Sequence, residues 1–250
     1  MNENPQKQHY IDVHDAYTAH YYDACSMRYR ERYMYSQLFK GLDLNGLKVA
    51  DLASGSGANS QAIVRLFPDA IVTGYDISPA ACQEYSENIK RPAYEVDLTI
   101  RGQEFSETYD VAMIVGGLHH CVADLESTFS NIDQMLKPGG ILIMFEPNSR
   151  FFLEKLRKIW YRNDRYFHAD TEEALSHDEI LKLNEATFEL IHLKNIGGPA
   201  YFLILNSLIF RIPLRLKPYI APPLNVLEDF YSLLSHPLFF PGFIAQWRKR

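Results

Sequence analysis

The chain contains few cysteines, and their placement excludes two common stabilising devices. Its 250 residues include only Cys25, Cys82 and Cys121, which are far apart and form no Cys-x-x-Cys pair. Such a set supports neither a disulfide framework nor a metal site, and it favours a reducing compartment. The polar N-terminus, Met1-Asn-Glu-Asn-Pro-Gln-Lys, lacks the apolar core of a signal peptide. We therefore expect a cytoplasmic protein without a bound metal.

Long apolar runs, internal repeats and low-complexity segments are also missing. The longest apolar run, residues 201–212, spans about a dozen residues where a membrane span needs about 20, and it contains Asn206, Ser207 and Arg211. The run therefore predicts no transmembrane helix. With 47% hydrophobic and 22% charged residues, the chain suits one globular domain, alone or with an embellishment.

Charge is distributed unevenly along the chain. Residues 197–250 contain six Lys or Arg and two acidic residues, a net charge of +4, so the remainder carries −10 of the total of −6. A body this acidic repels phosphate backbones, which argues against general nucleic-acid binding. The basic, apolar C-terminal region favours an anionic surface or partner instead.

Strands and helices alternate through the middle of the sequence. We expect strands at 48–52, 71–75, 93–96, 111–115 and 141–145, separated by helices at 59–66, 79–89 and 125–136, with Lys137-Pro-Gly-Gly140 as a helix stop and tight turn. A capping box at Ser176 and Glu179 predicts a helix over 176–184, followed by strands at 188–195 and 242–250. This order predicts a Rossmann-like, doubly wound α/β fold with a mostly parallel, seven-stranded sheet.

Three parts of the chain follow from this pattern. Residues 1–44 precede the first strand, and the tyrosine- and arginine-rich stretch 9–40 within them predicts an N-terminal helical flap. Residues 45–196 form the Rossmann-like core. Residues 197–250 form an apolar helical cap and the final strand, with 199–240 inserted before that strand and helices expected at 201–212 and 225–234.

The turn after the first strand is the strongest functional signal. In Val49-Ala-Asp-Leu-Ala-Ser-Gly-Ser-Gly57 the strand ends at Asp51, and glycines 55 and 57 allow a ligand to lie against the main chain. Asp76 ends the second strand 19 residues beyond Gly57. That offset matches the spacing at which nucleotide-binding folds place a carboxylate against ribose hydroxyls.

The later strand ends add three further features at the same edge of the sheet. Asp97 ends the third strand, the fourth leads into Gly116-Gly-Leu-His-His120, and the fifth ends at Glu146. The order of these motifs, with Leu136-Lys-Pro-Gly-Gly140, resembles class I S-adenosylmethionine-dependent methyltransferases over residues 45–196. The resemblance implies S-adenosylmethionine as cofactor and S-adenosylhomocysteine as product.

The resemblance also assigns cofactor contacts. It places Asp51 and the backbone of 53–57 around the methionine part, Asp76 at the ribose, and Asp97 with Leu98 beside the adenine. The complete set of expected cofactor residues is Tyr22, Asp51, Ala53, Ser54, Gly55, Gly57, Asn59, Asp76, Ile77, Asp97, Leu98 and Gly116. Ala53 stands where the family often has a glycine, and we expect this small residue to be tolerated.

Two alternative functions remain open from the residues alone. A nicotinamide-dependent oxidoreductase would place the Asp51 carboxylate near a pyrophosphate, which is electrostatically unfavourable, whereas a methionine ammonium would attract it. A protein that binds S-adenosylmethionine for interaction, without turnover, would need the same carboxylates as an enzyme.

Catalytic candidates lie at the ends of the fourth and fifth strands. Histidine suits general-base work near neutral pH, so His119 and His120 are candidates for taking a proton from the acceptor. The alternative is that one of them caps a helix or fills a polar gap. Glu146 faces the same side, with a backbone-bonded strand-end carboxylate as its alternative. Tyr22 is the expected flap contact to the cofactor, unless its helix simply packs on the sheet edge.

The acceptor is indicated only by the cap and one loop. Arg162, Arg165 and His168 are candidates for acceptor contact, although a charged loop of this kind is more often solvated. The cap can cover a lipophilic acceptor, form a homodimer, lie in a membrane interface with Trp247 and Arg248–Arg250 as anchors, or be extra core. No Asn-Pro-Pro-Tyr-type motif follows the fourth strand. We therefore expect a small apolar or aromatic acceptor, methylated on oxygen, carbon or nitrogen.

Overall fold

The computed structural model describes residues 19–250 apart from 104, 106–107, 157–158 and 160–172. The chain divides into two compact units that are each built from several segments. The first comprises 1–40, 148–171 and 194–243, and the second comprises 41–147, 172–193 and 244–250. The three-part division expected from the sequence stays a prediction.

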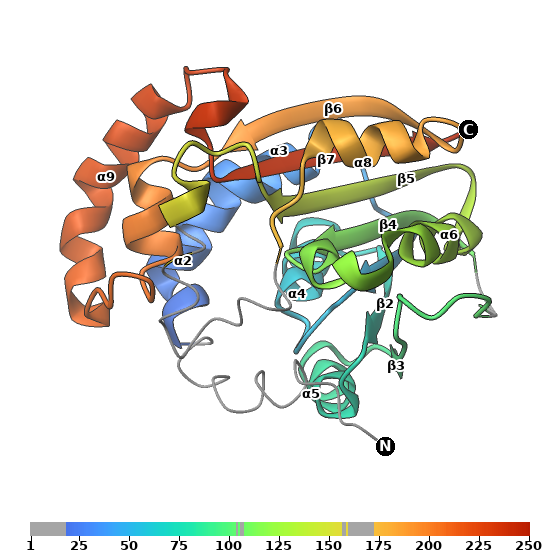
Figure 1. Ribbon diagram of the computed structural model, residues 1–250. Helices are drawn as coiled ribbons and strands as arrows, with labels where there is room; N and C mark the ends of the chain where they lie inside the picture. Colours follow the sequence, from blue (N-terminus) through green and yellow to red (C-terminus); the bar gives the residue numbers. More distant parts are fainter. Residues whose placement is uncertain (1–18, 104, 106–107, 157–158, 160–172) are drawn as a thin grey trace. The chain divides into compact units, whose positions relative to one another are not determined.

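Seven strands form one sheet in the order β3-β2-β1-β4-β5-β7-β6 (Figure 1). Strands β1 to β5 pair in parallel and β7 is antiparallel, which confirms the predicted Rossmann-like fold. Their bounds are β1 Lys48–Leu52, β2 Ile71–Asp76, β3 Ala93–Glu95, β4 Tyr109–Val115, β5 Leu136–Pro147, β6 Phe188–Ile196 and β7 Gly242–Lys249. The central strand β1 is buried from Val49 to Leu52, so its end is the natural place for a shielded site.

Four helices accompany the strands of the second unit: α4 Ala58–Leu66, α5 Pro79–Ile89, α6 Leu125–Met135 and α8 His177–Asn184. The capping residues explain why α5 was predictable to the residue. Ser78 accepts a hydrogen bond from the Ala81 N–H, Pro79 occupies the first turn, and Lys90 ends the helix in a left-handed conformation. The predicted bounds of α4 and α6 agree with the structure to within one residue.

Two local predictions in this unit are wrong. Ser176 is the N-cap residue of α8, but its side chain makes no capping hydrogen bond, so the predicted capping box does not form. The chain before the helix is fixed instead by the Leu175 N–H, which donates to the Pro147 carbonyl at 2.9 Å. The segment 137–140 is an irregular start of β5, with a register shift against β4, because Leu136 already pairs with Tyr109.

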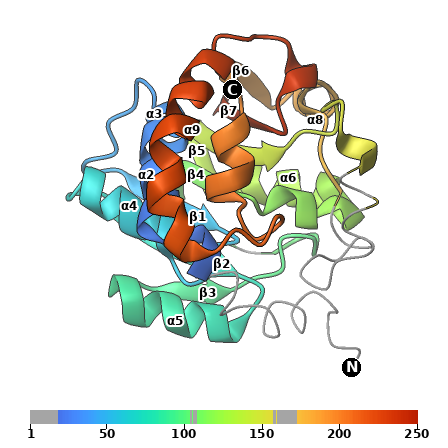
Figure 2. The same cartoon turned by 90° about the vertical axis from the view of Figure 1, so that its left-hand side faces the viewer.

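The first unit is helical. It contains α2 Ala24–Tyr29, the π-helical turn η1 Arg30–Tyr35, α3 Ser36–Leu38, the π-helical turn η4 Tyr201–Leu205, the short 3-10 turns η5 Leu214–Leu216 and η6 Pro237–Phe239, and α9 Lys217–Tyr231. Helix α9 lies beside α2, although about 190 residues separate them in sequence (Figure 2).

The two helices expected in the cap have different bounds. The run 201–212 forms only the short π-helical turn η4 followed by further turns, and α9 begins at Lys217 and continues through Pro222 and Pro223. Proline lacks an N–H donor and therefore usually ends or kinks a helix. Helix α9 tolerates the loss because polar side chains on both sides of the prolines, Lys217 and Glu228, hold it in place through buried bonds.

The C-terminal strand removes one predicted role. Trp247 is completely buried, stacks on Phe129 with 5.6 Å between ring centroids, and places its indole Nε1 3.2 Å from Nε2 of His177. Trp247 is therefore core, and the expectation that it anchors the protein in a membrane interface is wrong. No helix in the described part of the chain is long and apolar enough to cross a bilayer.

Candidate functional site

Asp51 is a buried carboxylate at the centre of the sheet. It lies on β1 between β2 and β4, and 1% of it is exposed. Its Oδ2 accepts a hydrogen bond from the Ser60 hydroxyl at 2.7 Å, whereas Oδ1 has no partner among the described residues. Burial raises the pKa of Asp51 to about 7, and the nearby charge of Asp76 adds to the rise. Burying a carboxylate oxygen without a partner costs free energy, and a donor group from a ligand would offset that cost.

The turn after β1 follows a conformation that few side chains permit. Ala53, Gly55 and Gly57 have positive φ angles of 50°, 53° and 91°. A Cβ added at Gly57 would meet Cγ1 of Ile89 at 2.5 Å, so glycine is needed there for space as well as for backbone angle. Ala53 adopts the left-handed region at a cost that glycine would avoid, and Ser54 has a buried hydroxyl without a partner among the described residues.

Asp76 connects this turn to the next strand. Its Oδ2 accepts from the Gly55 N–H at 2.8 Å, and its Oδ1 accepts from the Ser78 N–H at 2.9 Å. Burial raises the pKa of Asp76, while the backbone N–H groups that bond to it oppose the rise. The carboxylate predicted for ribose therefore also fixes the backbone of the glycine turn.

Asp97 and Leu98 follow the end of β3 rather than ending it. Oδ1 of Asp97 accepts from the Thr99 N–H at 2.9 Å and from the Thr99 hydroxyl at 2.6 Å, so the carboxylate caps its own turn. Leu98 is buried, and its carbonyl accepts from the Asn131 amide at 2.8 Å. Hydrogen bonds at both residues therefore hold this turn in place.

The remaining predicted cofactor residues of the second unit lie close to these turns in sequence. Asn59 is buried in the first turn of α4, and Ile77 directly follows Asp76. Gly116 has a φ angle of 68°, and its N–H donates to the Phe145 carbonyl at 2.8 Å. The glycine therefore carries the chain out of β4 while still bonded to β5.

Glu146 binds the turn that carries both histidines. This fully buried carboxylate near the end of β5 receives the backbone N–H groups of Gly117, Leu118 and His119 at 3.1, 2.8 and 3.2 Å. These donors open the short 3-10 helix η2, Leu118–His120. Burial raises the pKa of Glu146 to about 7, against the lowering effect of these backbone N–H groups.

The same carboxylate also reaches an imidazole. Oε2 of Glu146 lies 2.7 Å from Nδ1 of His119, and the His119 and His120 rings lie 4.0 Å apart between centroids. An ionised carboxylate can only accept, so the proton of neutral His119 then sits on Nδ1 and the lone pair on Nε2. Glu146 thus has the backbone bonds of the alternative interpretation and also contacts a histidine ring, while its catalytic role stays a prediction.

The sequence interpretation missed two residues of this unit. The Ser60 hydroxyl, which bonds to Asp51, also lies 2.7 Å from the Tyr85 hydroxyl. Burial together with the charge of Asp51 raises the pKa of Tyr85. Ser60 lies nine residues beyond Asp51, in the first turn of the helix after the glycine turn, and that place could have suggested it. Tyr85 has no sequence signal, since it is one apolar-face residue of α5 among several.

Four predicted residues lie either in the other unit or outside the described residues. Tyr22 belongs to the first unit, where the guanidinium of Arg30 lies 4.9 Å from its ring centroid. Its contact with the cofactor stays a prediction. Arg162, Arg165 and His168 lie outside the described residues. Within those residues, no group of three or more His, Cys, Asp or Glu side chains is arranged to hold a metal ion.

Part of the chain is similar in sequence to a family of known proteins and to individual relatives. Residues 50–142 match the model of a methyltransferase domain family. Over 105 residues the chain is 30% identical to a ubiquinone biosynthesis O-methyltransferase of Rhizobium leguminosarum bv. trifolii, covering 40% of each protein. Over 118 residues it is 25% identical to a highly reducing polyketide synthase of Calcarisporium arbuscula, covering 43% of this chain and 5% of that protein. The matched region thus spans less than half of the length of these relatives.

Solved structures share the fold at low identity. A protein of Pyrococcus horikoshii OT3 superposes with a TM-score of 0.61 at 15% identity, covering 96% of this chain and 99% of the other. A TehB-like SAM-dependent methyltransferase of Corynebacterium glutamicum gives a TM-score of 0.57 at 14% identity, covering 99% of this chain and 100% of the other. At these identities the likeness describes the fold alone.

Proposed function

We propose that this chain, which carries a class I S-adenosylmethionine-dependent methyltransferase domain, transfers a methyl group to a small molecule through a weakly acidic hydroxyl or carbon. The observation that carries the cofactor assignment is the buried Oδ1 of Asp51, which has no partner among the described residues. An ammonium group would supply the missing donor and charge. A pyrophosphate would instead meet a second negative charge there.

The other cofactor contacts follow from the turns that the structure fixes. Asp76 would accept the ribose hydroxyls while holding Gly55, and Leu98 would lie against the adenine beside the capped turn at Asp97. The glycine turn would allow the main chain to lie close to the methionine part, because Gly55 and Gly57 carry no side chain that would stand between them. When bound, S-adenosylmethionine supplies an electrophilic methyl group, and S-adenosylhomocysteine is left after transfer.

His119 is the proposed general base, and Glu146 is its positioning residue. The Glu146 carboxylate holds Nδ1 of His119 at 2.7 Å, so Nε2 is the atom whose lone pair takes the acceptor proton. A positioned general base contributes about 10²–10⁴-fold in rate. His120 stacks against His119 and is the alternative base.

This arrangement favours some acceptors over others. A neutral amine attacks without prior loss of a proton, whereas a hydroxyl or carbon acid benefits from a base. We therefore propose O- or C-methylation of a small apolar or aromatic molecule. The names of two relatives are compatible with this class, since one is an O-methyltransferase of ubiquinone biosynthesis and the other a polyketide synthase.

Two measurements, made one after the other, test the proposal. Titration calorimetry should show S-adenosylmethionine binding that Asp76→Asn weakens. Failure of the wild-type protein to bind the cofactor would end the assignment. Release of S-adenosylhomocysteine in the presence of a cell extract, and its loss in His119→Gln, tests turnover. Cofactor binding without product in any extract or acceptor panel would instead favour a binding protein.

A further inference from the structure

Helix α9 exposes apolar side chains and buries charged ones. Exposed fractions are 79% for Tyr219, 54% for Val226, 69% for Phe230 and 79% for Leu233. Tyr219, Val226 and Phe230 recur at intervals of seven and four, so they form one row along the helix. Leu233 follows three residues later, in the turn just beyond the last helical residue, Tyr231. In an ordinary surface helix the row of apolar residues faces the core, and here it faces outward.

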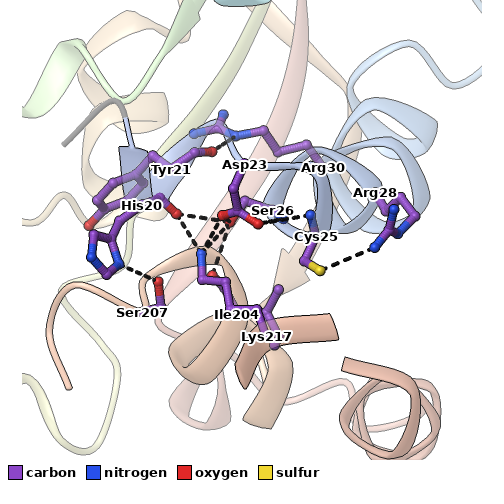
Figure 3. Close-up of polar contacts among 10 residues, drawn as sticks. All are labelled: His20, Tyr21, Asp23, Cys25, Ser26, Arg28, Arg30, Ile204, Ser207 and Lys217. Atoms are coloured by element: carbon purple, nitrogen blue, oxygen red, sulfur yellow. Dashed lines mark hydrogen bonds and ion pairs between the residues drawn. The ribbon is translucent and has the colours of Figure 1, made fainter. Parts of the chain in front are cut away.

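The rotation of the helix is fixed by its two buried charges. The Lys217 ammonium donates to the His20 carbonyl at 2.7 Å and to the Ser26 hydroxyl at 2.9 Å, and it forms an ion pair with Asp23 (Figure 3). Lys217 has no exposed surface, and its ion-pair partner Asp23 is the N-cap residue of α2. Burial lowers the pKa of Lys217, while the hydrogen bond and the charge of Asp23 oppose that shift.

Glu228 holds the other end of the same face. Its Oε1 accepts from the Tyr29 hydroxyl at 2.6 Å and the Gly198 N–H at 2.8 Å, and its Oε2 accepts from the Ala200 N–H at 2.9 Å. Eleven residues separate Lys217 from Glu228, which is close to three helical turns and places them on one face. A rotation of α9 that turned the apolar row toward the core would remove both charges from their partners. The two buried charges therefore fix the outward orientation of the row.

The exposed charged residues that shortly precede the row in the chain are positive. Among residues 210–239, all of which the structure describes, the exposed and formally charged residues are Arg211 and Arg215, just before the start of α9. The one other acidic residue of α9, Asp229, is half-buried and paired with Arg32 at 2.6 Å. The apolar row is extended by further exposed side chains on the neighbouring turns, namely Phe210, Leu214, Leu216, Leu238 and Phe239.

We propose that this surface, the α9 face, docks on the headgroup region of an anionic lipid bilayer. An apolar helical row with aromatic residues and flanking arginines is the pattern that lies in a membrane interface. Basic residues next to such a row add attraction to anionic lipids. A second copy of the chain fits less well, because a two-fold pairing of α9 would bring like-charged arginines together without an acidic partner in the exposed row. The proposal is independent of the acceptor and of the methyl-transfer assignment.

Flotation of the full chain with lipid vesicles tests this docking. The probes are vesicles of phosphatidylcholine alone and of phosphatidylcholine with one third phosphatidylglycerol. We expect binding to the anionic vesicles, lost by about tenfold or more in the double variant Phe230→Ser, Leu233→Ser, because the apolar contact is removed. Arg215→Gln should reduce the preference for the anionic vesicles over the neutral ones.

The matched control is Leu183→Ser on α8, which removes an equally exposed leucine, 76% against 79% for Leu233, from a different surface. Its flotation should equal that of the wild type, and circular dichroism should show all variants folded. Absence of wild-type flotation, or equal loss in the Leu183 variant, would overturn the proposal. A wild-type dimer that the double variant dissociates, with no vesicle binding, would assign the face to a second copy instead.

Discussion

The Nδ1 atom of His119 lies 2.7 Å from Oε2 of Glu146, and the same carboxylate accepts three backbone N–H groups at the start of η2. The imidazole is therefore fixed both through its ring and through the turn that carries it. This double attachment leaves little freedom for the ring to rotate, which is the preorganisation that a general base requires.

His119→Gln should separate chemistry from cofactor binding. The variant keeps a polar side chain of similar reach but has no basic nitrogen, so turnover should fall by about 10²–10⁴-fold. S-adenosylmethionine affinity, measured by calorimetry, should stay within a few-fold of the wild type. Full turnover in this variant would transfer the role of base to His120 or remove it altogether.

Glu146→Gln should change how stability depends on pH. Burial raises the pKa of Glu146 to about 7 from 4.5. The folded state therefore binds the proton of this group more tightly than the unfolded chain does. The stability that this group contributes is complete below pH 4.5 and is lost as the pH rises through 7, by about 3 kcal/mol in total. The neutral glutamine should flatten that decline in thermal unfolding measured between pH 5 and 8, and it should lower turnover by weakening the hold on His119.

A wild-type curve that falls between pH 4.5 and 7 just as steeply as that of the glutamine variant would contradict this account. The slope must be compared rather than the absolute midpoint, because the substitution also replaces an acceptor of backbone N–H groups with an amide. That replacement can lower stability at every pH.

Asp51→Asn should stabilise the unliganded protein above neutral pH and weaken cofactor binding together. The pKa of Asp51 is raised to about 7 by burial, so its ionised form destabilises the fold as the pH rises through that value. The amide carries no charge to desolvate, but it also cannot pair with an ammonium. Chemical denaturation at pH 8 and calorimetry should report a higher midpoint and a loss of affinity of at least about tenfold, since ionic hydrogen bonds are worth about 1.5–3 kcal/mol.

Asp76→Asn should weaken S-adenosylmethionine binding while keeping the turn. The amide oxygen can still accept one of the two N–H groups, from Gly55 or Ser78, that the carboxylate receives. We expect a loss of affinity of about tenfold or more in calorimetry, because the remaining amide cannot accept both ribose hydroxyls. Asp69→Asn, at an exposed position in the loop before β2, is the control and should bind normally.

Gly57→Ala and Gly139→Ala form a matched pair that separates backbone strain from crowding. Both glycines have positive φ angles, 91° and 76°, but an added Cβ meets Ile89 at 2.5 Å only at Gly57 and nothing within 4 Å at Gly139. Each variant should lose about 1–2 kcal/mol from backbone strain, and Gly57→Ala should lose a further 1–3 kcal/mol from overpacking. Equal midpoints in urea unfolding would show that α5 moves aside without cost.

The parts of the fold that local chemistry specifies were predictable from the sequence. Ser78-Pro79 and Lys90 mark the two ends of α5 through capping and a left-handed end residue, and the structure has the same bounds. The spacing from Gly57 to Asp76 likewise identified a carboxylate that the structure links to the glycine turn, because it accepts from the Gly55 N–H. Each of these signals is carried by residues close together in the chain.

Helix α9 shows where such reasoning stops. Its periodicity identifies an apolar row but not the side to which the row points, because that depends on where Lys217 and Glu228 find partners nearly two hundred residues earlier in the chain. The prediction that Trp247 anchors the protein in a membrane interface is wrong for the same reason. An aromatic residue next to three basic residues resembles an interface anchor, but in the structure Phe129 and His177 pack against it. The hydrogen bond between His119 and Glu146 also links two strand ends whose pairing no local pattern gives.

The bonds from Tyr29 to Glu228 and from Asp23 to Lys217 have a consequence for biosynthesis. The residues of α2 leave the ribosome about two hundred residues before the side chains that complete their environment. At about 5–20 residues per second, that interval lasts on the order of 10–40 s. During it the nascent N-terminal helix lacks the partners of Asp23 and Tyr29, so its final packing is delayed until synthesis is almost finished.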